Sequence, residues 1–253
     1  TVEHCPPRAM FQDRQWPENF EFPSCKTCNQ GTSNEDQIIA MISRFDPNHV
    51  NIDESVKYMA GVQNNNPGLL EEMMPSNVEA RRMNRELGIK PGLGLTHQEL
   101  AGVKIVPQIE AAIGIFAAKL AKGIYFIECK KIFPAHGCLA LKVFTNTEFI
   151  GDGEPEVFEA LMNVSGNEPS LARSRSELND QFSYKFYPGE VDALFGLDVR
   201  IRFAFRLLIF GCTQPGRLES ILKQDAIASG QNDKFKILRT DGRADQAQRI
   251  HHP

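Results

Sequence analysis

The sequence predicts an α+β fold in which helices pack on an antiparallel sheet. Residues 106–122 place apolar side chains at helical spacing, which indicates a long amphipathic helix. Residues 137–145, 182–187 and 199–211 are rich in branched and aromatic side chains, with partial alternation, as strands are. Because these strands follow the helix in succession, without further helices between them, we expect their sheet to be antiparallel.

Helices are also expected in the first half of the chain. Capping arrangements of the form Ser-x-x-acid open helices over residues 33–45 and 76–87, and the first of these ends near an Asp-Pro pair. Residues 47–75 between them are polar and are predicted to be irregular, with a turn at 64–67. Together, residues 47–105 are expected to form a helical connecting region.

Composition and charge exclude several classes of protein. The apolar share of 42% and charged share of 24% are those of a globular domain, which excludes bulk disorder. The best apolar run, residues 109–127, contains Glu110, Lys119 and Lys122, so no membrane span is predicted. No secretory leader is visible and the six cysteines are sparse, which predicts a reducing, cytoplasmic setting. The net charge of −4 counts mildly against nucleic-acid binding, although a local basic groove suffices for it.

Residue types suited to metal binding and proton transfer gather in the loop-rich first 33 residues. Glu3-His4 is followed by two prolines, and Cys25 and Cys28 form a Cys-x-x-Cys pair directly before Asn29. A histidine accepts a proton from water near neutral pH. Carboxylate and amide oxygens suit magnesium or manganese, and thiolates suit zinc.

This order and spacing resemble the ββα-metal core of zinc-knuckle-containing HNH endonucleases, over residues 1 to about 45. The resemblance implies His4 as general base, with Glu3 and Asn29 as ligands of one magnesium or manganese ion. It implies that Cys25 and Cys28 bind a separate structural zinc ion. The expected activity is hydrolysis of phosphodiester bonds in DNA. On this interpretation residues 1–46 form the HNH-like module, and residues 106–253 form an α+β domain of unknown role.

The chain departs from the family pattern in two places. A structural zinc site needs four ligands, so a second cysteine pair is expected upstream of Thr1, with Cys129 and Cys138 as an alternative. Phe20 stands near the position where many relatives carry an Asn or His that orients the catalytic histidine. These departures leave a second hypothesis open, a non-catalytic zinc-stapled module that recognises nucleic acid or protein. A third is that the C-terminal part has an activity of its own.

Arginines cluster at two places that suit a nucleic-acid backbone. They are Arg81, Arg82 and Arg85 on the second helix, and Arg200 and Arg202, which alternate with apolar residues along a predicted strand. The helical cluster is equally explained as a solvated face. The strand cluster is equally explained as a wet sheet face or by pairing with Asp192 and Asp198.

Overall fold

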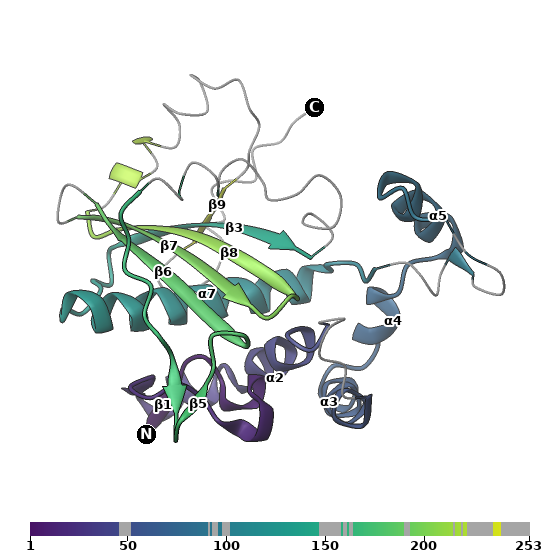
Figure 1. Ribbon diagram of the computed structural model, residues 1–253, viewed down its shortest axis with the longest axis horizontal. Helices are drawn as coiled ribbons and strands as arrows, with labels where there is room; N and C mark the ends of the chain where they lie inside the picture. The colour runs from purple at the N-terminus through teal and green to yellow at the C-terminus, as the bar shows by residue number, and fades with distance from the viewer. Residues whose placement is uncertain are drawn as a thin grey trace.

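The computed structural model has helices packed on one face of an antiparallel sheet, which confirms the predicted α+β class (Figure 1). The structure describes residues 1–45, 52–90, 92, 96–97, 102–146, 158, 161, 164–189, 193–214, 216–218, 220–221 and 235–238. None of the helices within these ranges is long and apolar enough to cross a bilayer.

Five antiparallel strands form the main sheet, in the order β6-β7-β8-β3-β9. They are β3 (Cys138–Thr145), β6 (Phe182–Pro188), β7 (Leu194–Ile201), β8 (Phe205–Cys212) and β9 (Lys236–Leu238). The strands predicted at 137–145 and 182–187 are confirmed. The prediction of one strand over 199–211 was wrong, because the chain reverses at residues 202–204 and Arg202 adopts a positive φ of 46°.

Helix α7 (Pro107–Cys129) covers one face of this sheet. Its Ile113, Leu120 and Ile124 are buried in the main core together with Leu197 and Leu207 from the sheet. Pro107 suits the first helical position, where its missing N–H has no partner to lose. The helix runs past its predicted end at Lys122.

Gly123 allows close packing in the middle of this helix. A Cβ atom at this position would lie 2.8 Å from the ring of Phe22. The missing side chain therefore allows Phe22 of the N-terminal segment to pack directly on the backbone of α7. The helix predicted over residues 106–122 ends directly before this glycine. A glycine within a helix is compatible with continued helix when a neighbouring element approaches there.

The N-terminal segment folds as two short strands followed by helices. Strands β1 (Val2–His4) and β2 (Glu21–Pro23) pair antiparallel, with the short 3-10 turns η1 (Arg8–Met10) and η2 (Gln12–Arg14) between them. Helices α1 (Lys26–Gln30) and α2 (Ser33–Ile42) follow. Strand, strand, helix is the order that the resemblance implies, but order alone does not identify an HNH module.

The region predicted as irregular contains two helices, α3 (Ile52–Asn65) and α4 (Leu69–Met73), so that prediction was wrong. Val62, Leu69 and Met73 are buried in the main core, and this packing stabilises both helices. Their mostly polar sequences give little sign of helix on their own. The predicted turn lies between them. Helix α5 (Asn77–Glu86) begins at the predicted capping box, in which Ser76 and Glu79 bond each other's backbone N–H groups.

Candidate functional site

The register of β1 sends the side chains of Glu3 and His4 to opposite sides of the strand. His4 lies across from Glu21 on β2, and Glu3 lies across from Phe22, the residue that packs on α7. Because successive side chains of a strand alternate between its faces, the two residues that the resemblance assigns to catalysis occupy different environments.

His4 lies in a half-buried position at the end of β1. Its ring packs edge-on against Trp16, with 4.7 Å between the ring centroids. Its Nδ1 atom is buried and has no hydrogen-bond partner among the described residues. Burial, together with the positive charge of Arg8, lowers the pKa of His4 below 6.5. The imidazole is therefore neutral at physiological pH and can accept a proton.

Two arginines flank this histidine through their contact with Trp16. The guanidinium carbon of Arg173 lies 3.8 Å from the centroid of the Trp16 ring, and that of Arg8 lies 5.0 Å from it. Glu21 accepts hydrogen bonds from Trp16 Nε1 at 3.2 Å and from Arg173 at 3.4 Å. Two guanidinium groups beside a neutral imidazole suit an anionic substrate such as a phosphodiester.

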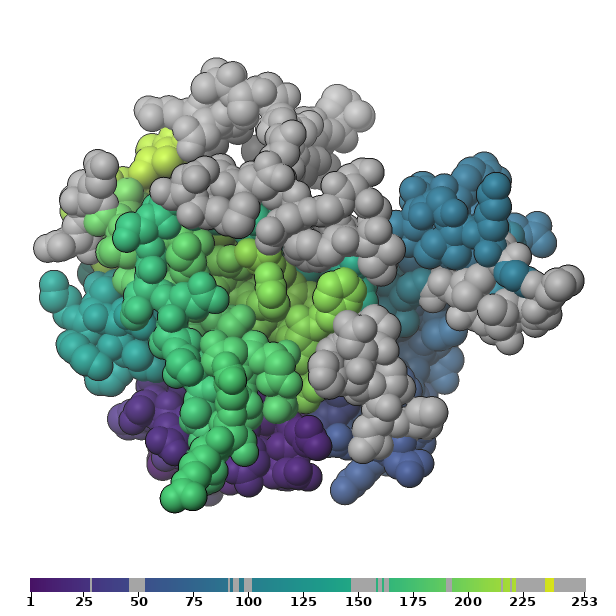
Figure 2. All heavy atoms as spheres, viewed as in Figure 1, coloured from purple at the N-terminus to yellow at the C-terminus, as the bar shows by residue number. Residues whose placement is uncertain are grey.

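Arg173 reaches this place from a distant part of the chain. It belongs to the small hairpin of β4 (Ala172–Arg173) and β5 (Ser176–Glu177), which lies beside the N-terminal segment (Figure 1). Figure 2 shows the green atoms of this part of the chain extending over the purple N-terminal segment. The Arg173 side chain also donates to the backbone carbonyl of Trp16. We name His4, Arg8, Trp16, Glu21 and Arg173 the His4 site.

Glu3 lies on the other side of β1 and is 9% exposed. Its Oε1 atom is 2.6 Å from the ammonium of Lys119 on α7. The same ammonium bonds Asp36 and Thr32 at the beginning of α2. The carboxylate that the resemblance assigns to a divalent metal ion is therefore engaged by a cation of the chain itself.

Asn29 lies in α1 and holds the beginning of β1. Its Nδ2 atom donates to the carbonyl of Val2 at 2.8 Å and to the hydroxyl of Thr1 at 3.3 Å. Within the described ranges, no group of three or more His, Cys, Asp and Glu side chains is placed to hold a metal ion. With Glu3 bound to Lys119, the Glu3 and Asn29 side chains as placed do not fit a magnesium or manganese ion, and we assign no chemical step to one.

The zinc site stays a prediction. Cys25 is exposed to solvent directly before α1, and the side chain of Cys28 lies outside the described residues. Cys5 is fully buried, and this burial raises the pKa of its thiol to about 12. A thiol with so high a pKa stays protonated at neutral pH.

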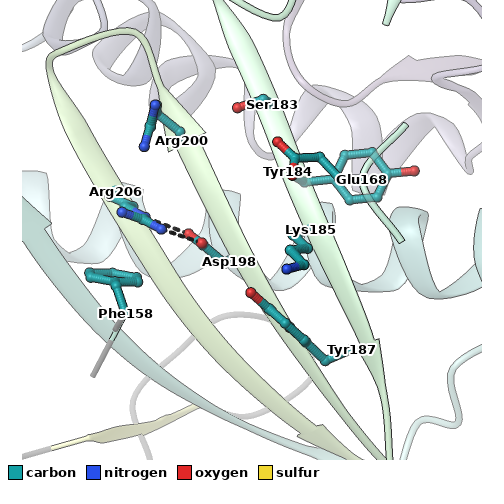
Figure 3. A pocket seen from close by; sticks show the side chains of 9 residues that line it. All are labelled: Phe158, Glu168, Ser183, Tyr184, Lys185, Tyr187, Asp198, Arg200 and Arg206. Atoms are coloured by element: carbon teal, nitrogen blue, oxygen red, sulfur yellow. Dashed lines mark hydrogen bonds and ion pairs between the residues drawn. The ribbon is translucent and has the colours of Figure 1, made fainter. Parts of the chain in front are cut away.

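A polar cavity of about 190 Å³ lies over β6, β7 and β8, on the face of the sheet opposite α7 (Figure 3). Arg206 and Asp198 form a buried bidentate pair on its floor, and the Arg206 guanidinium stacks on the Phe158 ring at 3.5 Å. Arg200 lies directly across from Arg206 in the β7–β8 register. Lys185 lies across from Asp198 on β6.

The charges in this cavity favour an anion. Lys185, Arg200 and Arg206 bring three positive charges to the sheet face, whereas Asp198 brings one negative charge, with Glu168 at the edge. Like charges directly across a strand pair repel each other. Arg200 is exposed and forms no hydrogen bond or ion pair within the described part of the chain. The pairing alternative is realised for Asp198, which binds Arg206, whereas Asp192 lies outside the described residues.

The other arginines predicted to contact nucleic acid lie in different settings. Arg202 is in the β7–β8 turn, where it donates to the carbonyl of Met10 and to Gln181, so the prediction that it shares a strand face with Arg200 was wrong. Arg81, Arg82 and Arg85 are exposed on α5. Arg82 lies 3.9 Å from Glu86 as a surface ion pair. A solvated helix face and a nucleic-acid contact both agree with this arrangement.

Comparison with known proteins adds no relative: no family model matches the chain, and no curated protein or solved structure matches it either. The site is therefore interpreted from its own geometry. Of the residues that make up the His4 site, the sequence pointed only to His4.

Proposed function

We propose that this chain hydrolyses phosphodiester bonds in nucleic acid, with DNA as the expected substrate and His4 as the general base. The observation that carries the proposal is the half-buried imidazole of His4, with its lowered pKa, beside the guanidinium groups of Arg8 and Arg173. The order of β1, β2 and the following helices supports it, because this is the order in which HNH endonucleases present their histidine.

The residues of the His4 site have complementary tasks in this reaction. His4 takes a proton from the attacking water as the new bond from water oxygen to phosphorus forms. Arg8 and Arg173 stabilise the negative charge that builds on the phosphate oxygens. The bond from phosphorus to the leaving oxygen then breaks, and that oxygen takes a proton from solvent. Trp16 holds both guanidinium groups by cation–π contacts.

The divalent ion of the proposal, magnesium or manganese, stays a prediction. When bound, such an ion would supply positive charge to the phosphate and the leaving oxygen. Glu3 can bind such an ion only if its contact with Lys119 breaks. Cleavage assays with and without metal ions test this dependence. The structural zinc ion expected at Cys25 and Cys28 is a separate prediction.

We also propose that the cavity on the open sheet face holds a backbone phosphate of the substrate. Arg200 and Lys185 point to the same face of the sheet, and the aromatic ring of Tyr187 lies beside the Lys185 ammonium (Figure 3). An anion there balances the charges of Arg200 and Lys185, whereas the charge of Arg206 is already balanced by Asp198. The three strands position these groups before the substrate arrives.

Replacing Arg200 by Ala should weaken DNA binding and lower its dependence on salt. Each phosphate contact contributes about 0.9 to the slope of log affinity against log salt concentration, so removing one contact should lower that slope by about 1. Fluorescence anisotropy with a labelled duplex from 50 to 300 mM salt measures it. An Arg82→Ala variant tests the α5 face in the same way, and an unchanged slope in the Arg200 variant contradicts the assignment.

The rate of cleavage should fall in acid because protonated His4 cannot act as a base. The pKa of His4 is lowered from 6.5 by burial and by Arg8, so the fall should be centred below pH 6.5 and the rate should be level near neutrality. Rates measured between pH 4.5 and 8 give this profile. A profile centred above pH 6.5 would show that another group limits the rate.

Cleavage of supercoiled plasmid by the purified full chain tests the proposed function. Nicked and linear products should appear, and parallel reactions with magnesium, manganese, zinc or a chelator show which ion the reaction needs. If a folded preparation gives no product under any of these conditions, the proposed nuclease activity is refuted.

The second candidate is a binding module without catalysis. The contact of Glu3 with Lys119 favours it, because this contact occupies the carboxylate that a metal-dependent nuclease would use. This candidate predicts salt-dependent affinity for nucleic acid and no cleavage. The plasmid and anisotropy experiments together distinguish the two functions.

A further inference from the structure

The ammonium of Lys119 is enclosed by oxygen atoms from two elements of the N-terminal segment. It lies 2.6 Å from Oε1 of Glu3, 2.9 and 3.1 Å from the two carboxylate oxygens of Asp36, and 3.1 Å from the Thr32 hydroxyl. An ammonium has three protons to donate, and three residues accept them here. The hydrogen-bonding capacity of the group is therefore filled.

This cluster is largely buried. The exposed fraction of the side chain is 13% for Lys119, 11% for Glu3 and 21% for Asp36, so water contributes little to solvating their charges. The hydrogen bonds from Lys119 to the carboxylates of Glu3 and Asp36 favour the charged form of the amine.

The cluster also has the charge of an occupied cation site. Two carboxylates carry two negative charges, and together with a hydroxyl they form an all-oxygen set of the kind that hard divalent ions prefer. Lys119 places one positive charge at its centre. The side chain comes from α7, whereas its partners come from β1 and the beginning of α2, so the contact joins the N-terminal segment to the helix that covers the sheet.

We propose that Lys119 is the resident cation of the N-terminal segment: its ammonium takes the place of a divalent metal ion between Glu3, Asp36 and Thr32. While Lys119 is there, Glu3 does not bind a divalent ion. Removing the ammonium leaves the carboxylates of Glu3 and Asp36 without a counter-charge, and a divalent ion then enters the same oxygen set. This role concerns the Glu3 side of β1 and goes beyond the hydrolysis proposed for His4.

Thermal unfolding of the full chain with and without Mn²⁺ tests this inference. In the presence of a chelator, Lys119→Met should unfold roughly 5–10 °C below the unaltered chain, because a buried ion pair loses one partner. Millimolar Mn²⁺ should restore part of this loss. The double variant Lys119→Met with Glu3→Gln should show no such recovery, because the second change removes a ligand.

Two comparisons control for general effects of charge and metal. Lys104→Met removes the cation of a more exposed pair, in which the ammonium lies 3.4 Å from Glu79, and should neither lower the midpoint as much nor create a response to Mn²⁺. Calorimetric titration of the unaltered chain and of Glu3→Gln with Mn²⁺ needs no Lys119 variant. The two should bind Mn²⁺ alike, because Glu3 is already occupied.

Either of two results overturns the inference. One is an Mn²⁺ site in the unaltered chain that Glu3→Gln abolishes, since the ion would then bind at Glu3 alongside the lysine. The other is a folded Lys119→Met variant that gains no affinity for Mn²⁺. If Lys119→Met does not fold, the calorimetric comparison alone decides. No readout here involves cleavage, so the outcome is independent of the outcome for His4.

Discussion

Replacing His4 by Ala should slow cleavage of plasmid DNA by roughly 10²–10⁴-fold, the usual contribution of a positioned general base. The reason is that no other side chain of the His4 site is free to accept the proton. Arg8 and Arg173 are cations, and the Glu21 carboxylate already accepts hydrogen bonds from Trp16 and Arg173. The initial rate of nicking under single-turnover conditions measures the effect. DNA affinity should change little, because the phosphate contacts are made by other side chains.

A matched change elsewhere separates catalysis from general damage. His136 is exposed in a turn before β3 and has no proposed role, so His136→Ala should cleave at the rate of the unaltered chain. Circular dichroism and thermal unfolding of both variants establish that they are folded. Equal loss of rate in the two variants would remove the special role of His4.

Replacing Asp198 by Ala should lower the free energy of unfolding by about 3–5 kcal/mol, the cost of leaving a buried charge without its partner. Asp198 and Arg206 are each 9% exposed, and the bidentate contact satisfies both. The Phe158 ring stacks on the guanidinium and covers part of it. Chemical denaturation followed by circular dichroism measures the change.

The double variant Asp198→Ala with Arg206→Met distinguishes an unpaired charge from a lost contact. Removing both charges should recover much of the stability, because buried ion pairs are often replaced by apolar residues without loss. The exposed pair of Arg82 and Glu86 provides the control, and Glu86→Ala should cost less than about 1 kcal/mol. A double variant as unstable as Asp198→Ala would show that the arginine charge is not the cause.

Elements with local signals were predicted well. The capping box of Ser76 and Glu79 marks the beginning of α5, and the apolar spacing after Val106 marks most of α7, because these patterns depend on neighbours within a few residues. The helices α3 and α4 were missed because they are stabilised by burial of a few apolar side chains in a core built by distant segments. The β7–β8 turn was missed because its residues have apolar neighbours and no typical turn sequence.

The candidate site was only partly predictable for a similar physical reason. His4 stands in a recognisable local motif, whereas Arg173 contacts Trp16 across 157 positions of the chain. Lys119 and Asp36 are 83 positions apart, and no local sequence pattern around either residue predicts their contact. Tertiary packing brings these groups together, so the cation at Glu3 became visible only in the folded chain.

Chemical rescue of a His4→Gly variant tests the proposed base most directly. Small imidazoles of different pKa are added to the variant, and the rate of plasmid nicking is compared with that of the unaltered chain. We expect the variant to be nearly inactive and added imidazole to restore cleavage. More basic imidazoles should restore more, at a pH where each is neutral. Cleavage by His4→Gly at the unaltered rate, or an inactive variant that no imidazole rescues, would contradict a proton-accepting role for His4.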